Sequence, residues 1–146
     1  MEMLDHLMLG FSVASLPMNL AFCFLGVLLG TVIGILPGIG PLATISMLLP
    51  LTFGMSPVTS LIMLSGIFYG AQYGGSTTAI LVNLPGEASS TVTMIDGYQM
   101  ARRGRAGPAL AVAAIGSFFA GTVTTMLIAV VAVPLTAVAL SFGPAE

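Results

Sequence analysis

Two glycine- and proline-rich segments, residues 36–41 and 70–78, contain the groups best suited to bind an ion or a small polar ligand. The first holds Gly38 and Gly40 between two prolines, and the second ends in three consecutive hydroxyl side chains. Carbonyls and hydroxyls supply oxygen ligands, which hard cations prefer. A half-helix that begins after a break also directs unpaired N–H groups and its positive dipole end at the gap. The two segments therefore predict a site for a cation together with an anion.

The candidate ligands are the glycines of both segments and the polar side chains beside them: Gly38, Gly40, Gly74, Gly75, Ser76, Thr77, Thr78, Gln72 and Asn83. A sodium ion would use the set Gly38, Gly40, Gly75 and Ser76. Two structural alternatives stay open, because the hydroxyls could simply cap a helix and the prolines could only kink the chain. We favour binding, since polar groups in lipid are costly unless they are used.

The scarcity of reactive side chains argues against several classes of protein. The three basic residues are all arginine, so no lysine is present for a phosphate-binding Walker A loop. His6 is the only histidine, which argues against a metal site or a Ser–His catalytic pair, and Cys23 is the only cysteine. We therefore expect no enzyme and no resident cofactor. With no basic surface, we also expect no nucleic-acid partner.

Residues 7–86 contain no Asp, Glu, Lys or Arg, although glycine and proline are frequent among them. The chain is 57% hydrophobic and 5% charged, with a mean hydropathy of +1.10, whereas soluble domains have about 25% charged residues. A charge-free run of this length belongs in the lipid bilayer. Broken helices at membrane depth are typical of secondary transporters. We predict an all-α, polytopic transmembrane fold with broken or re-entrant helices.

The expected elements follow from the apolar runs. Residues 18–36 form one membrane-spanning helix, in which Gly26, Gly30 and Gly34 make a row that another helix can approach closely. The first break separates this helix from a short helix over 42–49, which Pro50 ends. A further helix begins at Pro57 and stops at residue 69. The second break, at residues 70–78, separates it from another short helix over 79–84.

Residues 87–107 form the hydrophilic loop, which follows the broken-helix region 18–86. Its arginines, Arg102, Arg103 and Arg105, predict a cytoplasmic location by the positive-inside rule. Thr93 and Asp96 have the spacing of a helix start. Residues 108–142 are apolar again and predict one span to about Val130, followed by a bend near Pro134.

Residues 1–101 contain no Lys or Arg, so an anion bound there would need helix dipoles, hydroxyls or a co-bound cation. Glu87 and Asp96 are acidic groups that could bind a cation or carry a proton. Their polar neighbourhood instead favours a solvated loop.

Three long motifs resemble those of one transporter family: GILPGIGP at 34–41, LLPLTFGM at 48–55 and GIFYGAQYGGSTT at 66–78. The resemblance continues through LPGE at 84–87, DGY at 96–98 and AR at 101–102. It covers residues 18 to 146. The chain resembles the large membrane subunit, TctA type, of the tripartite tricarboxylate transporters. We expect residues 1–146 to be the N-terminal part of one longer transmembrane permease domain.

The resemblance implies a multi-pass permease of the bacterial inner membrane. It implies two partners, a small membrane subunit and a periplasmic solute-binding protein. The implied activity is uptake of citrate or a related carboxylate, driven by a sodium or proton gradient and not by ATP. Two other functions stay open, a non-transporting scaffold that anchors a complex and a passive channel.

Overall fold

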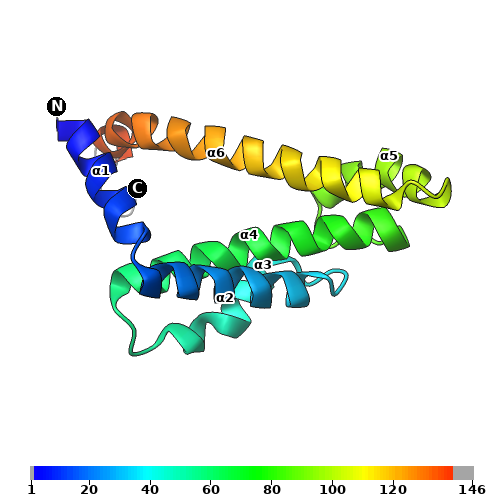
Figure 1. The fold of residues 1–146 in the computed structure, drawn as a ribbon, viewed down its shortest axis with the longest axis horizontal. Helices are drawn as coiled ribbons and strands as arrows, with labels where there is room; N and C mark the ends of the chain where they lie inside the picture. Colours follow the sequence, from blue (N-terminus) through cyan, green and yellow to red (C-terminus); the bar gives the residue numbers. More distant parts are fainter. Residues whose placement is uncertain (1, 140–146) are drawn as a thin grey trace. The chain divides into compact units, whose positions relative to one another are not determined.

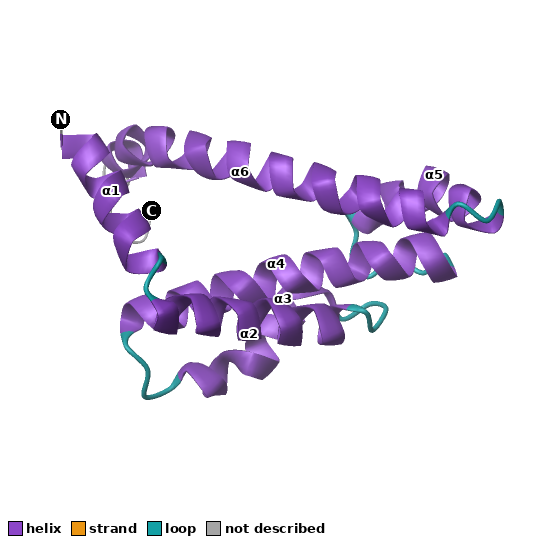
Figure 2. Ribbon diagram, viewed as in Figure 1, coloured by secondary structure: helices purple, strands orange, loops and turns teal. Residues whose placement is uncertain are grey.

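The structure is a computed structural model that describes residues 2–139, and every regular element in that range is helical (Figures 1 and 2). The predicted all-α class is therefore confirmed. The elements in chain order are α1 (Glu2–Ala14), α2 (Pro17–Gly34), α3 (Gly40–Leu48), the short 3₁₀ helix η1 (Leu49–Thr52), α4 (Pro57–Val82), α5 (Ser90–Arg102) and α6 (Ala106–Ala139).

Two helices of the described range are long and apolar enough to cross a membrane. These are α2, at Pro17–Gly34, and the Ala106–Ala132 part of α6, with mean hydropathies of 1.8 and 1.9. The chain divides after Leu110 into two compact units, so most of α6 belongs to the second. Both helices agree with the predicted membrane fold.

The centre of the first unit is the contact between α2 and α4, which is made by glycines from both helices. A Cβ added to Gly30 would collide with the Ile67 carbonyl oxygen, and one added to Gly34 would lie 2.5 Å from the Ala71 Cα. Gly70 and Gly74 of α4 meet the backbone of α2 in the same way. Small residues allow such close approach, and close approach maximises dispersion contacts. Ile67, at the middle of this contact, is 0% exposed.

The two helices run parallel, because the contacting positions advance together along both chains (Figure 1). Near their first residues, the Thr59 hydroxyl donates to the Asn19 side-chain oxygen over 2.8 Å. Near the other end, the Thr78 hydroxyl donates to the Ile35 carbonyl over 2.7 Å. Residues 36–56 must therefore return from the end of α2 to the start of α4. The α3–η1 segment makes this return.

The first break is confirmed, since α2 ends at Gly34 and α3 begins at Gly40. Gly38 has φ 84° and Gly40 has φ 64°, which L side chains rarely adopt, so glycine is needed at both positions. The expected short helix is also present, with α3 spanning 9 residues. Pro57 begins α4, and the Ser56 hydroxyl caps it by accepting from the Thr59 N–H over 3.3 Å.

The prediction of a second break is wrong, because α4 runs without interruption from Pro57 to Val82 through residues 70–78. An interior glycine costs a helix only about 1 kcal/mol. In α4 that cost is offset where Gly70 and Gly74 allow the close approach of α2. A continuous helix also satisfies its own backbone groups, which lipid requires. The separate helices expected over 58–69 and 79–84 are thus one helix.

The hydrophilic segment contains a helix, α5, that packs against α4 with Gly97 facing Ile80. The helix begins at Ser90, so Thr93 lies inside it and the predicted start is wrong. The Ser90 hydroxyl instead donates to the Glu87 carbonyl over 2.8 Å. Farther along, α6 continues as helix past residue 134, the position of the predicted bend, to Ala139. Residues 140–142 of the predicted span lie outside the described residues.

Candidate functional site

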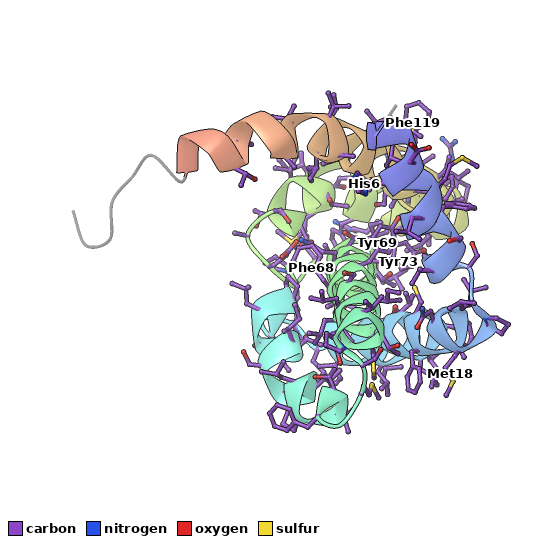
Figure 3. All side chains as sticks on the ribbon, turned by 90° about the vertical axis from the view of Figure 1, so that its left-hand side faces the viewer. His6, Met18, Phe68, Tyr69, Tyr73 and Phe119 are labelled. Carbon is purple, nitrogen blue, oxygen red and sulfur yellow. The ribbon has the colours of Figure 1, made fainter. Side chains whose placement is uncertain are left out.

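A pocket of about 440 Å³ lies where the first break, the middle of α4 and the segment after α4 come together. Its lining residues are Gly38, Ile39, Gly40, Pro41, Leu42, Phe68, Gln72, Gly86 and Glu87. Figure 3 shows Phe68 on a different side of α4 from Tyr73. Gln72 follows Phe68 by four residues, so the two side chains share one face of the helix. That face forms the wall of the pocket.

The pocket exists because the chain turns back after α4. Asn83 ends the helix in the left-handed conformation, with φ 61°. Gly86 then lies directly against Gly75 of α4, with the backbones in contact. The next residue, Glu87, lies close to the start of α3, because a Cβ built on Gly40 would be 3.7 Å from the Glu87 Cβ. The two Leu-Pro-Gly segments, at 36–38 and 84–86, are therefore neighbours in the fold.

Of the residues predicted to bind ligands, the structure brings Gly38, Gly40 and Gln72 together at this pocket. Gly75 lies behind it, in contact with Gly86. Gly74 packs against the end of α2, and Asn83 is the exposed cap of α4. The sodium set of Gly38, Gly40, Gly75 and Ser76 does not converge, because Gly75 and Ser76 lie within α4 and do not line the pocket.

The three consecutive hydroxyls bond to backbone carbonyls. Ser76 donates to Gln72 over 3.2 Å and Thr77 donates to Tyr73 over 3.0 Å, both within α4. Thr78 is only 4% exposed and donates across to Ile35. The Ile35 carbonyl follows the last turn of α2, where helices leave carbonyl oxygens without partners. Thr78 thus joins α4 to the end of α2.

Replacing Thr78 with valine should lower the free energy of unfolding by about 0.5–1.5 kcal/mol, because the partly buried hydrogen bond to the Ile35 carbonyl is lost. The matched control is Thr77→Val, which removes a hydroxyl bonded within its own helix and should cost much less. The melting temperatures of the two purified full-length variants would be compared with that of the wild type. Equal effects of the two substitutions would contradict the interhelical role of Thr78.

Glu87 lies in the loop between α4 and α5, as sequence reasoning favoured, but its surroundings differ from the expected solvated loop. It is half-buried and lines the pocket. Its carboxylate accepts a short hydrogen bond from the Ser89 hydroxyl, and its N–H donates to the Ser90 hydroxyl over 3.2 Å. The signal that could have found it is the second Leu-Pro-Gly, which repeats the sequence of the first break.

The start of α3 forms another part of the pocket wall. Its N-cap residue, Ile39, provides no side-chain hydrogen bond to the helix. The first N–H groups of α3 therefore depend on partners other than a capping side chain. The Gly40 carbonyl, in contrast, accepts the hydroxyl of Thr44 over 2.8 Å. The pocket brings the first residues of α3 beside Gln72 and Glu87, and no group of three or more His, Cys, Asp or Glu side chains that could hold a metal occurs within the described residues.

Comparison with known proteins identifies a family and a relative of this chain. The sequence pattern of the Tripartite tricarboxylate transporter TctA family matches residues 20–146. A protein of Agrobacterium vitis, described as an uncharacterized 52.8 kDa protein in the TAR-I ttuC' 3' region, is 70% identical over 146 residues. That match covers 100% of this chain and 29% of the relative. No solved structure matches the chain.

Proposed function

Because the chain belongs to the tripartite tricarboxylate transporter TctA family, we propose that it forms part of a large permease subunit that couples carboxylate uptake to a cation gradient. The observation that carries this proposal is the pocket between the two Leu-Pro-Gly segments. It joins a broken helix, the amide of Gln72 and the carboxylate of Glu87. Sites at broken helices are characteristic of secondary transporters.

The proposed partners are a small membrane subunit and a periplasmic solute-binding protein, and the proposed location is the bacterial inner membrane. The family's name supports partners of this kind, since it describes a tripartite system. A binding protein would deliver the carboxylate, and sodium or protons would drive its entry. The substrate proposed first is citrate, a tricarboxylate.

The test is uptake of labelled citrate by cells that carry the full-length gene and both partner genes. The expected result is accumulation that requires an inward sodium or proton gradient and the binding protein. Citrate flux that requires neither the ion gradient nor the binding protein would indicate a passive channel. Uptake that persists when the permease gene alone is deleted would indicate a scaffold, and either result would overturn the proposal.

The arginine-bearing segment gives a separate test of orientation. Gln99 is exposed on α5, three residues before Arg102. In a full-length background whose native cysteines are replaced, Gln99→Cys should resist a membrane-impermeant maleimide in spheroplasts and react in inverted vesicles, because basic loops stay in the cytoplasm. Reaction in spheroplasts would place the segment on the outer side instead.

A further inference from the structure

One ionisable side chain, that of Glu87, lines the pocket. The other lining residues are glycine, proline, apolar side chains and the amide of Gln72. The Glu87 carboxylate accepts its short hydrogen bond from a neutral donor, the Ser89 hydroxyl. An ionised Glu87 therefore makes this pocket negative.

A negative pocket is poorly suited to a carboxylate substrate, because like charges placed together disfavour each other's ionised forms. We propose that Glu87 is a cation-binding residue of the pocket, and that a sodium ion must bind there before the carboxylate. This inference rests on the proposed transport function. The carboxylate of Glu87 and the amide oxygen of Gln72 are ligands that a hard cation prefers. The bound ion neutralises Glu87, so that the entering anion no longer meets a negative pocket.

The position of Glu87 is fixed by the backbone around it. Gly86 lies against Gly75, and the Gly40 backbone lies beside the Glu87 Cβ. The Ser90 hydroxyl bonds to both the N–H and the carbonyl of Glu87. Ser90 itself is 2% exposed. Glu87 is thus held at the pocket wall by groups from α3, α4 and the start of α5.

The first measurement is equilibrium binding of radioactive sodium to the purified full-length protein. We expect saturable binding by the wild type and a loss of affinity of about tenfold or more in Glu87→Gln, since an ionised oxygen ligand is replaced by a neutral one. Glu87→Asp keeps the charge and should keep measurable binding. The matched control is Asp96→Asn, which makes the same chemical change at an exposed position of α5 and should leave sodium binding unchanged.

The second measurement is binding of labelled citrate to the same proteins, with choline replacing sodium at constant ionic strength. Wild-type protein should bind citrate only with sodium, whereas folded Glu87→Gln should bind it equally well without sodium. In the sodium measurement, the inference is overturned if the wild type binds no sodium or if Glu87→Gln binds sodium as the wild type does. In the citrate measurement, it is overturned if Glu87→Gln still requires sodium to bind citrate or binds no citrate. It is also overturned if Glu87→Asp loses sodium binding, because packing would then explain the effect.

The two proposals can fail separately. Sodium binding that depends on Glu87, in a protein that moves no carboxylate in the cell assay, would support the cation site and overturn the transport function. Gradient-driven uptake that Glu87→Gln leaves unchanged would support transport and overturn the role of Glu87.

Discussion

Replacing Gly30 with alanine should destabilise the full-length protein by about 3 kcal/mol or more, the upper end of overpacking effects. The added methyl group would collide with the carbonyl oxygen of Ile67. That atom belongs to the α4 backbone and cannot move aside as a flexible side chain would. The α2–α4 contact would have to open along its length. We expect a lower melting temperature and a smaller yield of monodisperse protein in detergent.

The control for this substitution is Gly10→Ala on α1, where an added Cβ meets nothing within 4 Å. It makes the same chemical change and should be neutral or slightly stabilising, because alanine favours helix more than glycine does. Gly70→Ala disturbs the same contact from the α4 side, because its added methyl group would collide with the Val27 carbonyl oxygen. It should lower the melting temperature as much as Gly30→Ala does. Wild-type melting temperatures for Gly30→Ala and Gly70→Ala would refute the glycine-mediated contact.

Replacing Gly86 with alanine should reduce carboxylate uptake by up to about a hundredfold, the effect expected when a binding group is displaced by ~1 Å. A Cβ on Gly86 would overlap the Gly75 Cα and lie 3.1 Å from the Gly75 carbonyl carbon. The segment that carries Glu87 would therefore move away from α4 and change the pocket wall. The α2–α4 contact lies elsewhere, so the folded protein should survive. Initial uptake rates and melting temperature would be measured together.

The control for Gly86→Ala is Gly107→Ala, which places a methyl group where nothing lies within 4 Å. It should leave both uptake and melting temperature near wild-type values. Wild-type uptake by Gly86→Ala would show that the pocket does not depend on this close contact. A large fall in melting temperature would show that Gly86 acts on the whole fold.

Sequence reasoning located the first break because the prolines and glycines at residues 36–41 exclude a continuous helix. Pro37 and Pro41 lack N–H groups, and the positive φ angles of Gly38 and Gly40 fit that expectation. The same reasoning failed at residues 70–78, where no proline occurs. Gly70 and Gly74 are there for contact with α2, and the meaning of such glycines depends on a partner helix that local sequence does not specify.

The pocket was only half predictable for a related reason. Gly38, Gly40 and Gln72 could be chosen as polar or broken positions within an apolar run. Glu87 lay in the hydrophilic segment, and its approach to Gly40 depends on the turn at Asn83 and on the fit of Gly86 to Gly75. These are tertiary contacts between positions far apart in sequence. The repeated Leu-Pro-Gly hinted at them, but three residues could not establish a pairing.

The parallel arrangement of α2 and α4 means that both helices carry the chain in the same direction. Because α2 is long and apolar enough to cross a membrane and α4 packs along it, the start of α2 and the end of α4 lie at opposite ends of this pair. Residues before α2 and residues after α4 must then face opposite compartments. If the arginines that follow α4 are cytoplasmic, α1 lies on the outer side. The glycines that join two helices thereby also decide which end of the chain faces the outside.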